Sequence, residues 1–143
     1  MKPILIIGLP GSGKTTLAKA LSGAIKAVHW NADEVRLNLN KDLTFSKEDR
    51  IEQARRMGWL SSNVTSAGVV CIADFVCPLE ECRISFGDAF TIFVDRINEG
   101  RFTDTNIIWE RPTKYDVIIH DGLSIEEELL MVLGHENIIT SLA

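Results

Sequence analysis

The stretch GLPGSGKT, residues 8–15, stands between the apolar run ILII of residues 4–7 and a helical pattern predicted over 15–21. It fits the pattern G-x-x-x-x-G-K-[ST], in which glycines let a tight loop turn successive backbone N–H groups toward phosphate oxygens. Such a loop needs a buried strand before it and a helix after it, and the sequence supplies both. These residues predict a site for a nucleoside triphosphate.

Within this motif the lysine and the threonine have distinct chemical roles. Lys14 is expected to neutralise the β- and γ-phosphates, and Thr15 to place its hydroxyl on Mg²⁺. The following helix adds the positive end of its dipole. ATP and Mg²⁺ are therefore the expected cofactors, with Lys14 as a catalytic residue. The predicted phosphate-binding residues are Gly8, Gly11, Ser12, Gly13, Lys14, Thr15 and Thr16.

Short apolar runs alternate with helical patterns along the remaining chain. Strands are expected at 26–30, 69–73, 89–94 and 117–119, and helices at 31–37, 78–86 and 124–133. A longer helix is expected from a capping box at Ser46–Asp49 to Gly68. Its stripe of apolar residues should face the core: Ile51, Ala54, Met57, Leu60 and Val64.

This alternation predicts an α/β fold, a parallel sheet of about five strands flanked by helices, in a single domain over 1–143. Ligands should bind at the carboxyl ends of the strands. The one long stretch without a clear pattern, 95–116, is a candidate mobile loop over the site.

Composition narrows the functional class. The chain of 143 residues carries 15 basic and 20 acidic residues, a formal charge of −5 that speaks against general nucleic-acid binding. No apolar run approaches the ~20 residues that span a bilayer, and the opening run is too short for a signal peptide. Three cysteines, an odd number without metal-ligand spacing, suit a reducing compartment, so a cytoplasmic protein is expected. Cys71, Cys77 and Cys82 are interpreted as small buried hydrophobic residues.

Acidic and basic residues near the predicted strand ends are candidates for chemistry. Asp33 could accept a proton from an attacking hydroxyl or hold Mg²⁺, and Arg36, one helical turn on, could bind an anionic acceptor. The alternative is a helix-capping aspartate beside a solvated arginine. Asp74 directly follows the predicted strand 69–73 and is a candidate for positioning Mg²⁺, with a loop cap as the alternative.

Arginines also gather on the long helix. Arg50 and Gln53 share a face with Met57, and Arg55 and Arg56 lie close by, which suggests a local anion site. The alternative is a solvated helix face whose arginines pair with Glu48 and Glu52.

Several stretches together resemble the adenylylsulfate kinase family, in the short form seen in phage-type proteins. Besides the loop at 8–16, DEVR at 33–36 resembles the family's D-G-D-N-[VI]-R. FSKEDR at 45–50 is similar to F-S-E-E-D-R, and the next two arginines fall on the family's R-R pair. FVCP at 75–78 resembles F-I-S-P, and Phe102-Thr103 resembles the F-T of the family's lid.

The resemblance implies transfer of the ATP γ-phosphate to the 3′-hydroxyl of adenylylsulfate, so both small molecules are expected partners. Asp33 would contact the acceptor hydroxyl and the metal, and Arg36 and Arg50 would bind the phosphosulfate. Phe45 and Phe102 would sandwich the adenine, as aromatic faces favour. A homodimer is possible, and a phage-encoded protein would work in the host cytoplasm.

The chain departs from the family at four places. Asn31 replaces an acid, Cys77 replaces a serine and Gln53 replaces an asparagine of the acceptor site. Most of the lid is missing, because only six residues separate Asp95 from Phe102. The remaining lid candidates for stabilising charge are Arg96, Arg101 and Arg111.

These departures leave two other functions open. The acceptor could be another nucleotide, a nucleic-acid end or a small metabolite. The chain could also be a module that binds ATP and transfers nothing. Survival of Lys14, Thr15, Asp33 and Arg36 argues against the module.

Overall fold

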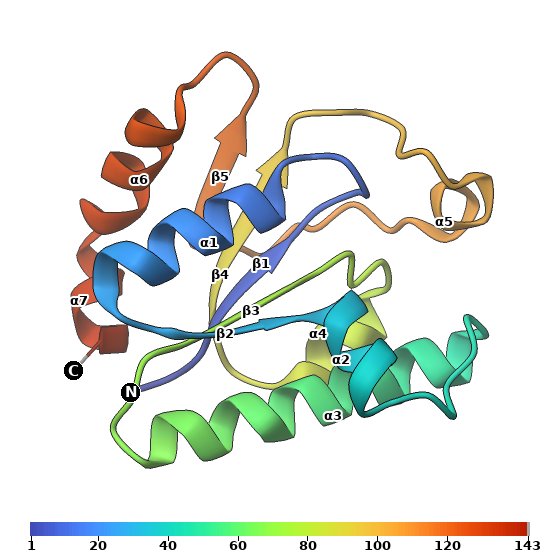
Figure 1. Cartoon of the computed structure of the whole chain (residues 1–143). Coiled ribbons are helices and arrows are strands. Elements are labelled where there is room, and N and C mark those ends of the chain that lie inside the picture. The colour runs from blue at the N-terminus through green and yellow to red at the C-terminus, as the bar shows by residue number, and fades with distance from the viewer. Residues whose placement is uncertain (143) are drawn as a thin grey trace.

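Five parallel strands form one sheet in the order β2-β3-β1-β4-β5, so the predicted α/β class is confirmed (Figure 1). The computed structural model describes residues 1–142. The strands are β1 (Ile4–Ile7), β2 (Val28–Asn31), β3 (Cys71–Phe75), β4 (Phe90–Asp95) and β5 (Val117–His120). The helices are α1 (Lys14–Ile25), α2 (Ala32–Asn38), α3 (Lys47–Ser66), α4 (Glu80–Phe86), α5 (Thr103–Ile108), α6 (Ile125–Leu133) and α7 (Glu136–Leu142).

Helices cover both faces of the sheet, which is why its strands are apolar on both sides. In β1, Ile4 and Ile6 belong to the core that they share with residues of α1, α6 and α7. Leu5 and Ile7 belong to the other core, which they share with residues of α2, α3 and α4. Alternate residues of one strand thus hold the two helical layers together.

The order of the strands fixes where a ligand can bind. From the central β1 the chain first builds β2 and β3 on one side and then crosses to β4 and β5 on the other. In such sheets ligands occupy the crevice at the carboxyl ends of the strands, where the direction of winding reverses. That point is the end of β1, where the loop 8–13 begins.

Two strands begin two residues later than the sequence predicts. Lys26 has a left-handed φ of 57° and closes α1, and Ala27 donates to the Ser22 carbonyl, so both belong to the helix end. Val69 likewise donates to Val64 at the end of α3. Strand β3 therefore ends at Phe75, and Asp74 lies within the strand rather than after it.

The stretch 95–116 is not the irregular loop that the sequence suggests, because it contains α5. The side-chain amide of Asn106 both accepts from the Gly100 N–H and donates to the Gly100 carbonyl, which folds the stretch back on itself. A helix of six residues has too few turns to show an apolar period. Helix α7, beyond the predicted end at residue 133, was missed as well.

Ser46 caps helix α3 as predicted, but only half of the expected capping box forms. Ser46 Oγ accepts from the Asp49 N–H at 3.2 Å, whereas the Asp49 carboxylate accepts from Thr44 instead. Ala54 and Met57 of the predicted stripe are buried, but its other members are only partly so, since Arg50 and Gln53 take buried positions. A Cβ at Gly58 would lie 2.0 Å from the Phe86 carbonyl oxygen, so glycine permits the close crossing of α4.

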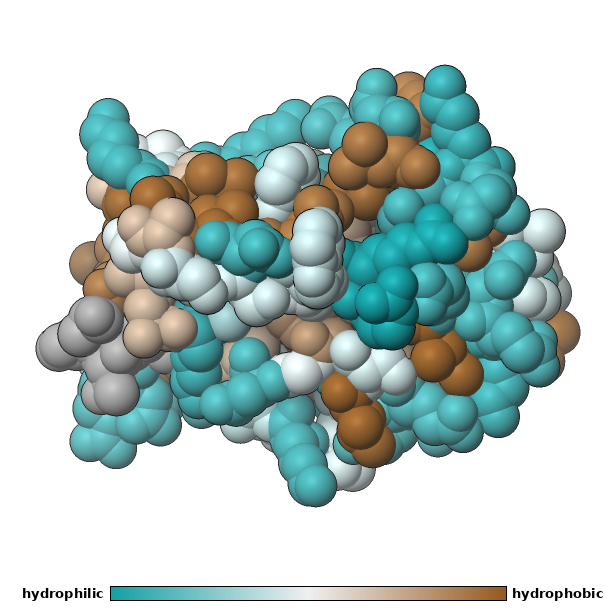
Figure 2. All heavy atoms as spheres, turned by 90° about the horizontal axis from the view of Figure 1, so that it is seen from below, coloured by the Kyte–Doolittle hydropathy of each residue, from teal (hydrophilic) through white to brown (hydrophobic). Residues whose placement is uncertain are grey.

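All three cysteines are buried and free, as predicted, and burial raises the pKa of each thiol. Figure 2 shows the face on which α3 lies, with apolar side chains in separate patches among hydrophilic ones. Within residues 1–142, no helix has the length and apolar character to cross a membrane.

Candidate active site

The loop after β1 presents backbone donors and one lysine to a cavity. Gly13 has a φ of 97°, a conformation that favours glycine, and a Cβ there would lie 3.1 Å from Arg96 Nη1. Helix α1 begins directly after it, with no side-chain cap and no acidic residue in its first turn. Its free N–H groups and positive dipole end are therefore available to an anion.

Lys14 is 8% exposed and lies back over the loop, with Nζ 3.5 Å from the Leu9 carbonyl oxygen. Burial lowers the pKa of its ammonium, and the charge of Arg101 acts in the same direction. Asp74 and Asp33 oppose this and raise the pKa. A buried cation between these groups is suited to receive the negative charge of phosphates.

Gly8 and Ser12 of the loop are packed closely against their surroundings. Ser12 is 3% exposed and its Oγ is buried without a hydrogen-bond partner. A Cβ at Gly8 would lie 2.7 Å from that Oγ and 2.8 Å from the Val94 carbonyl oxygen. The loop is thus seated tightly on β4, and its outer rim, including Gly11 and Thr16, lines the cavity.

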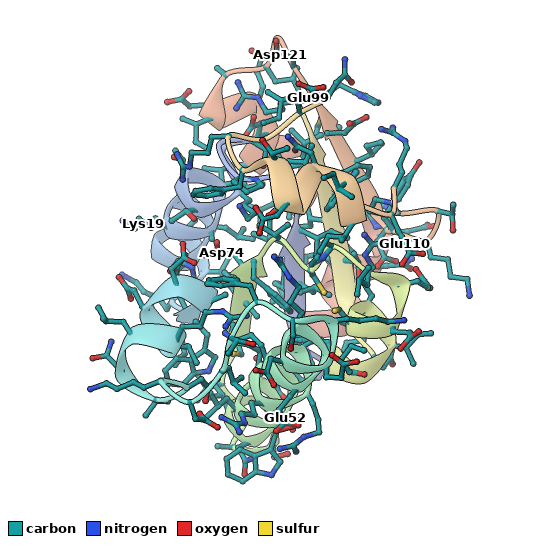
Figure 3. All side chains as sticks on the ribbon, turned by 90° about the vertical axis from the view of Figure 1, so that its right-hand side faces the viewer. Lys19, Glu52, Asp74, Glu99, Glu110 and Asp121 are labelled. Atoms are coloured by element: carbon teal, nitrogen blue, oxygen red, sulfur yellow. The ribbon has the colours of Figure 1, made fainter. Side chains whose placement is uncertain are left out.

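The carboxylate of Asp74 contacts three side chains from two elements, α1 and β2, at the end of the sheet. It is 1% exposed; Thr15 Oγ1 donates to Oδ1 at 2.9 Å and Asn31 Nδ2 at 3.2 Å. His29 Nε2 contacts Oδ2. Figure 3 looks onto this end of the sheet, where Asp74 lies near the middle of the view below the lid residue Glu99. Asp74 therefore fixes the Thr15 hydroxyl at the start of α1.

His29 is a site residue that sequence reasoning missed. Strand β2 pairs with β3 so that Asn31 stands beside Asp74. Alternate residues of a strand share a face, so His29 lies on the same side as Asn31. The alternation of side chains along β2 would therefore have placed His29 beside Asp74, had the strand been predicted to end at Asn31.

Asp33 lies in the first turn of α2, exposed, beside this cluster. Asn31 caps the helix, with its side chain accepting from the Glu34 N–H at 3.1 Å, so Asp33 does not serve as the cap. Asp33 lines a cavity of about 630 Å³ with Lys14 and Thr15, and two smaller ones of about 70 and 40 Å³. Its carboxylate stands where these cavities meet.

The main cavity joins the phosphate loop to the aromatic and arginine residues of the predicted acceptor site. It is about 630 Å³ in volume, and both Phe45 and Phe102 line it, 64% and 52% exposed. Its lining residues are Pro10, Gly11, Gly13, Lys14, Thr15, Thr16, Asp33, Phe45, Arg50, Val76, Arg101, Phe102 and Thr105.

Two guanidinium groups lie against the Phe45 ring. The Arg36 and Arg50 guanidinium carbons lie 4.4 and 5.3 Å from its ring centroid. Arg36 Nη1 donates to the Thr44 carbonyl at 3.0 Å, and Arg50 Nε donates to the Phe45 carbonyl at 2.8 Å. Burial, and next the charge of Arg50, lower the pKa of Arg36. Two adjacent cations held this way attract an anion.

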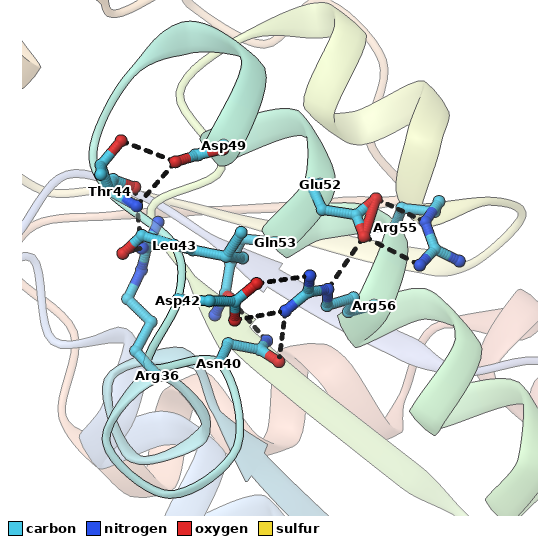
Figure 4. A network of polar contacts seen from close by, with 10 residues as sticks. All are labelled: Arg36, Asn40, Asp42, Leu43, Thr44, Asp49, Glu52, Gln53, Arg55 and Arg56. Atoms are coloured by element: carbon cyan, nitrogen blue, oxygen red, sulfur yellow. Dashed lines mark hydrogen bonds and ion pairs between the residues drawn. The ribbon is translucent and has the colours of Figure 1, made fainter.

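Gln53 and Cys77 line the 70 Å³ cavity beside this pair. Gln53 is 2% exposed; its Nε2 donates to the Ala32 carbonyl and its Oε1 accepts from Asn40 Nδ2 (Figure 4). Its amide thus supports the fold as well as the cavity. Cys77 has a φ of 47° and is 1% exposed, and burial raises the pKa of its thiol, which stays neutral.

Arg55 and Arg56 are not brought into the site. Both donate to Glu52, and Arg56 also forms two bonds with Asp42 at 2.8 and 2.9 Å (Figure 4). These arginines lower the pKa of Glu52 to about 2. For this pair, ion pairs on the outer helix face are the correct interpretation.

Of the three arginines predicted as lid candidates, one lines the main cavity and two form ion pairs with carboxylates. Arg101 lines the main cavity. Arg96 is paired with Glu128 at 3.1 Å, beside Gly13, and Arg111 forms two bonds with Asp95 at 2.6 and 3.0 Å. Because Asp95 and Arg111 flank the lid, their ion pair closes its base.

The donor set suits Mg²⁺. This ion is usually held by one or two carboxylates together with substrate phosphates and waters. Thr15, Asp33 and Asp74 bring one hydroxyl and two carboxylates to the 40 Å³ cavity next to Lys14. These three residues would hold the ion.

Known proteins match this chain in sequence and in fold. A family model described as adenylylsulphate kinase matches residues 2–99. The chloroplastic adenylyl-sulfate kinase of Catharanthus roseus is 34% identical over 85% of this chain and 49% of its own length. The adenylyl-sulfate kinase of a Picosynechococcus strain is 42% identical over 73% of this chain and 64% of its own. The chain thus spans about half to two thirds of these relatives.

Among solved structures, the APS kinase CysC of Mycobacterium tuberculosis, in complex with AMPPNP and APS, superposes with a TM-score of 0.86. The two are 24% identical, and the match covers 95% of this chain and 97% of that one, so it shows the shared fold. The relatives named are plant and bacterial proteins and lend no support to a phage-type form. The family model covers more than half of the chain, and the chain belongs to the adenylylsulfate kinase family.

Proposed function

We propose that the protein transfers the γ-phosphate of ATP to the 3′-hydroxyl of adenylylsulfate. The observation that carries this proposal is the single cavity lined by the phosphate loop, by Asp33 and by the Phe45, Arg50 and Phe102 group. A triphosphate on the loop and an anionic adenine nucleotide beside the arginines would meet at Asp33. Membership of the family supports adenylylsulfate as that nucleotide.

The triphosphate would lie along the loop from Gly11 to Thr16. Backbone N–H groups and the start of α1 would bind its oxygens, and Lys14 would bridge the β- and γ-phosphates. Burial lowers the pKa of the Lys14 ammonium because its charge is poorly solvated. The phosphate oxygens would supply the negative charge that compensates for this burial. Bound Mg²⁺ would neutralise charge between those phosphates.

The acceptor would enter on the other side of Asp33. Its adenine would lie between the Phe45 and Phe102 rings, and its phosphosulfate would bind Arg50 and Arg36. Asp33 would accept the proton of the 3′-hydroxyl as that oxygen forms its bond to the γ-phosphorus. The bond from the γ-phosphorus to the bridging oxygen then breaks, and ADP carries away its electron pair. Arg101 would stabilise charge on the transferred group.

The test is acceptor-dependent phosphoryl transfer. The protein is incubated with ATP and Mg²⁺ and offered adenylylsulfate beside nucleosides, other nucleotides, small metabolites and oligonucleotide ends, and products are identified by mass. Lys14→Ala serves as the blank, and Lys19→Ala, on the exposed side of α1, as its matched control. Phosphate gained by adenylylsulfate alone supports the proposal.

Two outcomes contradict it. Phosphorylation of another acceptor would keep the kinase chemistry and replace the substrate. ATP binding without transfer to any acceptor would identify a nucleotide-binding module.

A further inference from the structure

A carboxylate from the lid lies against the arginine of the acceptor side. Asp104 stands in the first turn of α5, and its Oδ2 is 3.4 Å from Arg50 Nη2. The Arg50 side chain is 9% exposed, whereas that of Asp104 is 71% exposed. One partner is therefore fixed in the protein and the other is free to leave into water.

The Nε atom of Arg50 is hydrogen-bonded within the protein, whereas its Nη2 atom faces the lid. Nε donates to the Phe45 carbonyl at 2.8 Å, and the guanidinium carbon lies over the Phe45 ring. These contacts leave the Nη2 edge directed toward Asp104 and the cavity that Arg50 lines. An oxyanion in the cavity would bind this same edge of the guanidinium.

We infer that Asp104 is a specificity-determining residue, a resident carboxylate that any anion must displace from Arg50. The identity of the acceptor in this inference rests on the proposed function. The competition between Asp104 and an anion for Arg50 rests only on the observed ion pair. A small inorganic anion gains only the arginines and displaces Asp104 poorly. An adenine nucleotide also gains the Phe45 and Phe102 rings, so it displaces the carboxylate and selectivity against inorganic sulfate follows.

Replacing Asp104 by an anion at Arg50 should change the stability of the lid little, so Asp104 can compete with ligands for this arginine. Two other features of the lid do not depend on Asp104: the Asn106–Gly100 bonds fold the lid back on itself, and the Asp95–Arg111 pair closes its base. A displaced Asp104 carboxylate is already largely hydrated, so its release carries a small desolvation change. The competition therefore acts on ligand affinity rather than on folding.

Two variants and two controls test the competition directly. Sulfate binding is followed by the melting temperature, against chloride at equal ionic strength, with a non-hydrolysable ATP analogue saturating the phosphate loop. Asp104→Ala and Asp104→Asn should each bind sulfate up to about fivefold more tightly, the strength of an exposed ion pair. Glu99→Gln, which removes another exposed lid carboxylate, should stay within about twofold. Arg50→Ala should lose the response.

Kinetics supply the second readout. In both Asp104 variants the KM for adenylylsulfate should fall by up to about fivefold while kcat stays within about twofold. An unchanged sulfate affinity, or a gain matched by Glu99→Gln, would overturn the inference. A raised KM would also overturn it and assign Asp104 to holding the lid in place. If the wild-type protein does not phosphorylate adenylylsulfate, the proposed function fails, and the sulfate measurement still decides the competition.

Discussion

The two ends of the cavity are built differently. At the phosphate end, buried and half-buried side chains on regular elements hold one another: Thr15, His29 and Asn31 all contact the buried carboxylate of Asp74. At the acceptor end, Phe45 and Phe102 are more than half exposed, and Arg50 pairs with a lid carboxylate that is open to water. The phosphate end is therefore preorganised to bind phosphates. At the acceptor end, single substitutions can change which acceptor binds.

The largest expected effect lies where the two ends meet. Asp33→Asn should lower kcat by at least ~10²-fold, the usual scale for a general base, and leave ATP affinity nearly unchanged. Steady-state phosphoryl transfer and ATP titration measure the two quantities. Glu34→Gln, the neighbouring acid on α2, is the matched control. Near-normal turnover of the Asp33 variant would remove this carboxylate from the mechanism.

The lid arginines give the next effect. Arg101→Ala should lower kcat between about tenfold and hundredfold, because a charged hydrogen bond contributes about 1.5–3 kcal/mol. Arg111→Ala, which breaks the ion pair at the base of the lid, should cost no more than about fivefold. Rates at saturating substrates compare the two. The reverse ranking would mean that lid geometry, and not the Arg101 charge, limits transfer.

Substitution of Arg50 tests whether the acceptor end and the phosphate end of the cavity act independently. Arg50→Ala should raise the KM for adenylylsulfate about tenfold, since one charged contact is lost, with the KM for ATP within about twofold. Arg55→Ala, on the outer face of the same helix, should change neither. Because Arg50 is buried, Arg50→Lys and a melting curve distinguish lost binding from lost folding. Equal rises in both KM values would mean that the two ends are not independent.

The smallest effect concerns the arginines outside the site. The pKa of Glu52 is about 2 in the folded protein against 4.5 ordinarily, so its stabilising contribution is present above about pH 4.5 and is lost as pH falls toward 2. Water screens this partly exposed group, so Glu52→Gln should cost less than about 1 kcal/mol at pH 7. Urea unfolding at pH 7 and pH 3 should show the difference from wild type shrinking in acid. Glu48→Gln is the control, and a difference that grows in acid would exclude the Arg55 and Arg56 pairing.

The sequence predicts the phosphate end better than the acceptor end, and the cause is physical. The loop at 8–15 and the run at 4–7 are local patterns, and the geometry follows from glycine conformations and strand burial. The role of Arg50 against Arg55 depends on which helix face meets the cavity, and the role of Arg101 against Arg111 depends on partners far along the chain. Asp104 was missed because its partner lies 54 residues away. His29 was missed because the end of β2 was misplaced by one residue.

The ion pair between Asp95 and Arg111 has an evolutionary consequence. It joins the two ends of the lid at the edge of the sheet, and Arg111 keeps the pKa of Asp95 low, so the junction persists over the neutral range. Lengthening a flexible loop costs only about 0.6 kcal/mol for each doubling. The segment between these two residues can therefore change in length at a small cost in folding free energy, and the acceptor side can diverge through it, because Phe102 lies in that segment whereas the loop 8–13 lies outside it.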